Sequence, residues 1–170
     1  GKYPSLRLRR NRKSGWSRRL VEENNLTPND FILPIFLIDG KNKKQTITSM
    51  PDVYRYTLDN VARVVDQAIK NGLPMIALFP YTEKKKKNEL GTEALNEDNL
   101  VCKAIQLIKK KYKNEIGIMC DVALDPYTSH GHDGLFKSNY VLNDETNKIL
   151  INQSLLQAQM GCDVLAPSDM

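Results

Sequence analysis

Residues 32–38 read Ile-Leu-Pro-Ile-Phe-Leu-Ile, and the Asp39-Gly40 pair that follows them is a turn signal. A short apolar run that ends at a turn predicts a β-strand, and because both faces of this strand are apolar we expect both to be buried. Farther along, residues 58–71 place apolar side chains three and four positions apart, and Gly72 follows them. This spacing indicates a helix that packs one face on a sheet.

The same unit of strand, loop and helix continues to the end of the chain. It predicts strands at residues 75–80, 116–124 and 163–169, and helices at residues 100–112 and 143–160. In the last helix, the apolar positions expected to face the interior are Ile149, Ile151, Leu155, Leu156 and Ala158. Because parallel strands need crossover connections, strands that alternate with helices predict a parallel α/β sheet.

Two architectures fit this periodicity, a doubly wound sheet and a (β/α)8 barrel. Neither GxGxxG nor GxxxxGK[ST] follows the first strand, which removes the usual evidence for a nucleotide-binding doubly wound fold. The sequence reaches Met170 with no helix after the fourth strand, which would leave a sheet edge open. We therefore predict the N-terminal half of a (β/α)8 TIM barrel, with four parallel strands in sequential order and three crossover helices.

We assign residues 31–170 to this half-barrel, truncated after its fourth strand, and residues 1–30 to an extended N-terminal arm. The net charge of the chain is +5, yet its first twenty residues carry eight Lys or Arg and no acid, so the remainder is mildly acidic. A basic arm is suited to binding phosphates, but this one also has apolar side chains that suit the surface of a neighbouring subunit. We expect no nucleic-acid partner. The apolar side chains of the arm are Leu6, Leu8, Trp16, Leu20 and Val21.

The cysteines and the hydropathy of the chain indicate in which cellular compartment the protein resides. Cys102, Cys120 and Cys162 are too widely spaced for a disulfide framework or a zinc motif, so we interpret them as reduced thiols. No apolar run approaches the roughly 18 to 20 residues that cross a bilayer, and the basic N-terminal stretch has no signal-peptide core. We expect a cytoplasmic protein with no membrane segment.

Polar side chains gather where the third predicted strand ends. Residues 120–134 read Cys-Asp-Val-Ala-Leu-Asp-Pro-Tyr-Thr-Ser-His-Gly-His-Asp-Gly. Alternation along a strand sends Asp121, Ala123 and Asp125 to one face and Cys120 to the other. Ligands bind at the carboxyl ends of parallel strands, and a buried carboxylate needs a partner, so we expect a site that handles a metal, a protonated amine or a lysine. The alternative is that these aspartates cap the following turns.

Other side chains at this edge have two interpretations each. His130 and His132 are either a metal-binding pair or loop residues hydrogen-bonded to the backbone. Ser168 and Asp169 are suited to orienting a nucleophile or relaying protons, or else to capping a following helix. The run Lys84–Lys87 is expected to be a solvated loop tip.

Several longer stretches carry a family pattern. The longest is Asp121-Val-Ala-Leu-Asp-Pro-Tyr-Thr-Ser-His-Gly-His-Asp-Gly134, and further stretches are Arg7–Asn11, Pro34–Phe36, Ser49–Pro51, Val53–Arg55, Ala77–Pro80, Gly91–Ala94, Tyr140–Thr146 and Ala166–Met170. Together they resemble the porphobilinogen synthase family, also called 5-aminolevulinic acid dehydratase. The resemblance covers essentially the whole chain.

The resemblance implies a lyase of porphyrin and heme biosynthesis that condenses two molecules of 5-aminolevulinate into porphobilinogen with the loss of two waters. Family members are barrels whose N-terminal arm embraces another subunit of a homo-octamer. Two lysines in the second half of the barrel form Schiff bases with the substrates. This chain stops before them, so we expect residues 1–170 to be inactive alone. Asp121, Ser168 and Asp169 match active-site positions of the family.

The resemblance also indicates which metal ion the enzyme uses. Three positions hold zinc-binding cysteines in one branch of the family, and here they are Ala123, Asp125 and Asp133. Carboxylate ligands suit Mg²⁺ rather than Zn²⁺, so we predict no zinc cysteine triad and a magnesium-using enzyme. Asp125 and Asp133 are the candidate metal ligands, and part of the magnesium response is expected to come from the missing half.

Two other hypotheses stay open on the sequence. One is another Schiff-base barrel lyase of the aldolase kind, which the fold class alone supports. The other is a non-catalytic fragment whose basic arm binds nucleic acid or an acidic partner.

Overall fold

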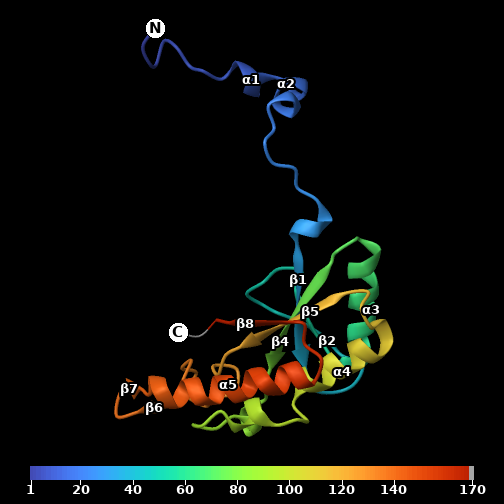
Figure 1. The fold of residues 1–170 in the computed structure, drawn as a ribbon, viewed down its shortest axis with the longest axis vertical. Coiled ribbons are helices and arrows are strands. Elements are labelled where there is room, and N and C mark those ends of the chain that lie inside the picture. The colour runs from blue at the N-terminus through green and yellow to red at the C-terminus, as the bar shows by residue number, and fades with distance from the viewer. Residues whose placement is uncertain (169–170) are drawn as a thin grey trace.

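The body of the molecule is built on one sheet. A computed structural model describes residues 1–168 and shows a six-stranded sheet in the order β2-β3-β1-β4-β5-β8 (Figure 1). Its central strands are β1 (Ile32–Ile38), β4 (Met75–Tyr81), β5 (Gly117–Val122) and β8 (Val164–Pro167). Each is parallel to the next. The predicted sequential order of four parallel strands is therefore confirmed.

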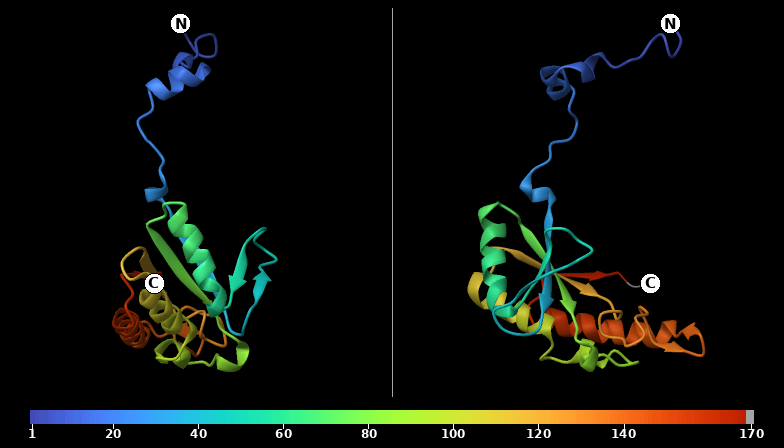
Figure 2. Two further views of the ribbon diagram at one scale, coloured as in Figure 1. Left: turned by 90° about the vertical axis from the view of Figure 1, so that its right-hand side faces the viewer. Right: turned by 180° about the vertical axis from the view of Figure 1, so that it is seen from behind.

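A helix follows each of the first three central strands and packs on the same side of the sheet (Figure 2). These helices are α3 (Leu58–Lys70), α4 (Leu100–Tyr112) and α5 (Asn143–Gln159), within one residue of the predicted bounds. Alternate strand residues such as Ile35, Ile76 and Ile118 pack against Val65 of α3 and Ile105 of α4 to form the main core. No helix among residues 1–168 is long and apolar enough to cross a membrane.

The sheet extends beyond β1 through two short strands that the sequence did not predict. β3 (Tyr54–Tyr56) runs parallel to β1, and β2 (Lys44–Thr46) runs antiparallel to β3. A separate hairpin joins β6 (Phe136–Lys137) to β7 (Tyr140–Val141). With two or three residues each, these strands are too short to show a period of two. The short 3-10 helices are η1 (Pro28–Asp30), η2 (Lys84–Lys86) and η3 (Thr92–Leu95).

The expectation that β1 is buried on both faces is wrong for the described residues. Ile35 and Leu37 are buried under the helices, whereas Pro34 is exposed and Phe36 is only half-buried on the opposite face. Phe36 packs on Phe79 of β4 with 5.6 Å between ring centroids. We call the face of the sheet opposite the helices its concave side. In a closed barrel this side points to the interior, and only the full set of strands covers it.

The expected inward face of α5 is also partly wrong. Ile151 and Leu155 are 59% and 56% exposed, and the buried positions include Gln153 and Gln157 instead. The apolar residues of α5 thus lie on two sides of the helix. Ile151 and Leu155 line an apolar hollow of about 540 Å³ between α5 and β8, at the edge of the sheet.

The N-terminal arm stands clear of the sheet and its helices (Figures 1 and 2). It contains two short helices, α1 (Arg10–Lys13) and α2 (Gly15–Leu20), which the sequence did not predict. Its apolar side chains have little to pack on, since Leu8 is 91% exposed, Leu20 78% and Trp16 66%.

Candidate active site

The carboxyl ends of β5 and β8 bring two of the predicted site residues together. The two strands pair in register through Asp121 and Ala166 and through Val122 and Pro167. Asp121 lies half-buried on the concave side, and the Ser168 hydroxyl donates a hydrogen bond of 2.5 Å to its Oδ1. Asp169, the third predicted residue, lies outside the described residues.

A second group of carboxyls lies in the loop that follows β5. Desolvation of the Asp125 carboxyl by the surrounding loop, together with the like charges of Asp133 and Asp121, raises the pKa of Asp125, and the Lys87 ammonium opposes this shift. Lys87 Nζ also donates to the backbone carbonyl of Asp125 at 3.3 Å. Asp125 and Asp133 are therefore close enough to repel each other, and a cation between them would relieve the repulsion.

The histidines take part in the loop's own structure. His130 accepts a hydrogen bond at Nδ1 from the backbone N–H of His132 (3.1 Å) and donates one from Nε2 to the Glu89 carbonyl (3.2 Å). Both ring nitrogens are thus occupied in the neutral tautomer. The His132 ring stacks on Phe136, with 4.2 Å between ring centroids. This arrangement fits the interpretation of both histidines as loop residues rather than a metal pair.

Thiol ligands do not converge at this site. Ala123 is buried, and Cys120 is fully buried on the opposite face of β5, against the helices. Among the described residues, no group of three His, Cys, Asp or Glu side chains is arranged to hold a metal ion. Any metal at Asp125 and Asp133 would therefore take most of its ligands from water or from residues outside this part of the chain.

The lysine run is not simply solvated, contrary to our expectation. Lys86 is half-buried and donates to Asp39 Oδ2 at 2.8 Å, with Glu93 at 3.8 Å, which ties η2 to the end of β1. The hydrogen bond to Asp39 raises the pKa of Lys86. Lys84 and Lys87 line a hollow of about 510 Å³ between the loops that follow β4 and β5. Sequence reasoning missed these contacts because the partners are far apart in the chain.

The β5 loop is anchored to the first turn of α5. Thr146 Oγ1 accepts a hydrogen bond from the Leu135 N–H (2.9 Å) and donates one to the Leu142 carbonyl (2.6 Å). A Cβ on Gly134 would lie 2.7 Å from the same oxygen, so glycine is needed at this close approach. This anchor fixes the loop that carries Asp125 and Asp133.

Sequential parallel strands, helices on one face and polar groups at the carboxyl ends define half of a (β/α)8-barrel protein. The sequence profile described as delta-aminolevulinic acid dehydratase matches residues 5–170, and the chain therefore belongs to that family.

Individual relatives agree with this assignment. The delta-aminolevulinic acid dehydratase of Bradyrhizobium diazoefficiens is 55% identical over 166 residues, covering 98% of this chain and 47% of the relative. That of Chlamydia pneumoniae is 42% identical over 166 residues, covering 98% and 50%. The crystal structure of the Toxoplasma gondii enzyme, in complex with its reaction product porphobilinogen, has a TM-score of 0.90 and 36% identity, covering 97% of this chain and 47% of that chain. The chain thus spans about half the length of the curated relatives it matches.

Proposed function

We propose that the protein containing this half-barrel is a porphobilinogen synthase, which condenses two molecules of 5-aminolevulinate into porphobilinogen with the loss of two waters. The observation that carries the proposal is the 55% identity to a delta-aminolevulinic acid dehydratase over 98% of this chain. The reaction belongs to porphyrin and heme biosynthesis.

The chemistry needs an amine nucleophile that the central strands of the sheet do not provide. A lysine amine adds to the substrate ketone, water leaves, and the resulting cationic imine acidifies the adjacent carbon for bond formation. The central strands β1, β4, β5 and β8 contain no lysine. We therefore place the Schiff-base lysines in the downstream half of the protein.

This half contributes groups that surround the reacting atoms. Asp121 lies on the concave side, where its carboxylate would stabilise a cationic imine and exchange protons with the substrate. Its hydrogen bond from Ser168 fixes the orientation of that carboxylate. By the family resemblance, Asp169 is a further acid-base group at the same edge.

The test is product formation. The full-length protein should convert 5-aminolevulinate into porphobilinogen, measured as the coloured adduct with an aldehyde reagent, and borohydride should trap the substrate on a lysine. Residues 1–170 alone should form neither product nor adduct. An inactive full-length protein would refute the proposal, and covalent trapping on residues 1–170 would refute the placement of the lysines.

We propose Mg²⁺ as the metal. The donor set supports it, because Asp125 and Asp133 offer hard carboxylate oxygens and Ala123 offers no ligand. Mg²⁺ is commonly held by one or two carboxylates with water completing its shell, so it does not need three protein ligands here. When bound, it would supply positive charge that neutralises this carboxylate pair.

The metal proposal is tested with chelators on the full-length protein. Activity should survive a zinc-selective chelator and should rise on addition of Mg²⁺. Loss of activity on zinc removal, with recovery by zinc and not by magnesium, would refute it and would make His130 and His132 the leading ligand candidates.

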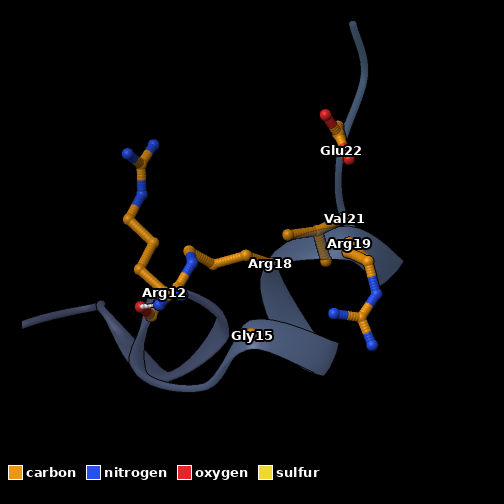
Figure 3. A pocket seen from close by; sticks show the side chains of 6 residues that line it. All are labelled: Arg12, Gly15, Arg18, Arg19, Val21 and Glu22. Carbon is orange, nitrogen blue, oxygen red and sulfur yellow. Dashed lines mark hydrogen bonds between the residues drawn. The ribbon is translucent and has the colours of Figure 1, made fainter. Parts of the chain in front are cut away.

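We propose that the arm, residues 1–30, binds a neighbouring subunit of a homo-oligomer, which is an octamer in the family. Its apolar side chains are exposed, and its arginines surround a hollow of about 570 Å³ that suits acidic groups. Figure 3 shows the side chains of Arg12, Arg18 and Arg19 around this hollow, together with Glu22. The mildly acidic body of a second copy is a complementary partner.

Light scattering of the full-length protein tests the role of the arm. Deleting residues 1–30 should reduce the oligomer to a smaller species. An unchanged mass would refute the proposal, and salt-dependent binding of the arm to duplex DNA at physiological ionic strength would favour a nucleic-acid partner instead.

We also propose a cytoplasmic location. It is supported by Cys102, Cys120 and Cys162, which are all free, as is usual in a reducing compartment. Cell fractionation with an antibody to the protein tests this.

A further inference from the structure

Two glutamines lie buried behind the candidate active site. Gln153 and Gln157 are four positions apart on α5, so they share one face of the helix, and they are only 1% and 3% exposed. Glutamine is rarely buried to this extent, and the binary pattern of α5 does not predict it. Both side chains point to the carboxyl end of β5.

Each glutamine binds the main chain of that strand end. Gln157 Nε2 donates a hydrogen bond to the carbonyl of Asp121 (3.0 Å), and Gln153 Nε2 donates one to the carbonyl of Ala123 (3.2 Å). The pairing of β5 with β4 stops at Cys120, and its pairing with β8 stops at Val122. The two side-chain amides therefore bind β5 at the end where its pairing with the neighbouring strands stops.

Packing alone does not account for these residues. The Oε1 atoms of Gln153 and Gln157 are buried and have no hydrogen-bond partner among residues 1–168. An unpartnered buried acceptor is costly, and an apolar side chain of the same length would fill the space without that cost. The amide N–H donors must therefore have a role that an apolar side chain could not fill.

This role is to fix the position of the carboxyl end of β5. Asp121 has its side chain on the concave side, bonded to Ser168, and its carbonyl bonded to Gln157 behind the sheet. From the functional role proposed above for Asp121, we infer that Gln153 and Gln157 are positioning residues, which fix the main chain of residues 121–123 so that the Asp121 carboxylate meets the reacting atoms.

The experiment uses the full-length protein with 5-aminolevulinate. Gln157→Met and Gln153→Met keep the length of the side chain and remove the donor. We expect kcat to fall by about tenfold to a hundredfold, because a displacement on the order of 1 Å in a reacting group has an effect of this size. KM should stay unchanged, since neither glutamine lies on the concave side where the substrate would bind. Gln157→Glu should retain most of kcat, because burial keeps its carboxyl protonated and able to donate.

Two controls separate positioning from stability. Gln159→Met changes an exposed glutamine of the same helix and should leave kcat unchanged. Leu156→Ala removes a buried apolar contact of α5, so it should lower the melting temperature while the folded fraction keeps its kcat. If Gln157→Met does not fold, Gln153→Met and the retained activity of Gln157→Glu still provide the test.

The outcomes distinguish this inference from the function on which it rests. A wild-type protein that forms no porphobilinogen would refute the proposed function and the positioning role with it. An active wild type whose methionine variants keep a normal kcat would overturn the positioning role alone. An equal loss of kcat in Leu156→Ala would also overturn it, because the effect would then be general to α5.

Discussion

Ser168 donates a hydrogen bond of 2.5 Å to Oδ1 of Asp121, and this contact joins the ends of neighbouring strands although the residues are 47 positions apart in sequence. Parallel strands that pair in register end at the same edge of a sheet, so their terminal side chains meet. The hydroxyl thereby limits the rotation of the Asp121 carboxylate. If this carboxylate handles protons, the activity should depend on the hydroxyl.

Ser168→Ala in the full-length protein should lower kcat by about tenfold to a hundredfold, since a hydrogen bond to a charged group contributes about 1.5–3 kcal/mol. Steady-state kinetics with 5-aminolevulinate measure the effect. Ser154→Ala is the matched control, because the Ser154 hydroxyl donates only to the Leu150 carbonyl within α5. Equal kinetics for the two variants would argue against a role for Ser168.

The sequence predicted the main parts of the fold because they follow from periodicity. The central strands are short apolar runs, and α3 places Val61, Val65 and Ala68 on one buried face. Alternation also placed Cys120 and Asp121 on opposite faces of β5, as the burial of one and the half-burial of the other confirm. These are local rules, and each needs only a few consecutive residues.

The remaining features depend on partners that are distant in the chain. Ile151 and Leu155 are apolar but exposed, whereas Gln153 and Gln157 are polar but buried, because α5 faces the open edge of the sheet as well as β5. The bond from Lys86 to Asp39 spans 47 positions, and no local pattern indicates it.

The contact between α3 and α4 provides a test of stability against pH. The Tyr112 hydroxyl donates a hydrogen bond of 2.7 Å to Asp66 Oδ1, and this bond, aided by Lys111, lowers the pKa of Asp66. A lowered carboxyl pKa contributes stability above the unfolded pKa of about 3.9, and the contribution is lost as the pH falls through the folded value.

Wild-type full-length protein should therefore melt at a higher temperature than Asp66→Asn at neutral pH, and the difference should shrink as the pH falls below about 4. Thermal unfolding followed by circular dichroism measures it. In a Tyr112→Phe background the same Asp66 substitution should have a smaller effect. A difference that grows on acidification would contradict the sign of the shift.

Gly134 should tolerate no side chain. In Gly134→Ala the new Cβ would lie 2.7 Å from Thr146 Oγ1 and 2.9 Å from Val141 Cγ1. Overpacking of this kind costs about 1–3 kcal/mol, so the melting temperature of the full-length protein should fall and the loop after β5 should become more sensitive to protease. Gly15→Ala is the control, since its Cβ would meet only arginine side chains at 3.6 Å or more. Equal stability of the two variants would show that the loop adjusts without cost.

The last prediction concerns the acidic pair Asp125 and Asp133 in the β5 loop. Relative to wild type, Asp125→Asn should raise the melting temperature without magnesium and lower it with magnesium. Without a metal, Asp125 and Asp133 repel each other, so Asp125→Asn should raise the melting temperature of the full-length protein slightly. With Mg²⁺ the wild type should gain stability, because an ion that binds only the folded state stabilises it, and Asp125→Asn should lose much of that gain.

Asp52→Asn changes an exposed residue of the loop between β2 and β3 and should alter neither value. A magnesium response that is the same in wild type and Asp125→Asn would place the metal elsewhere in the protein, and a response to Zn²⁺ alone would refute the argument from carboxylate ligands.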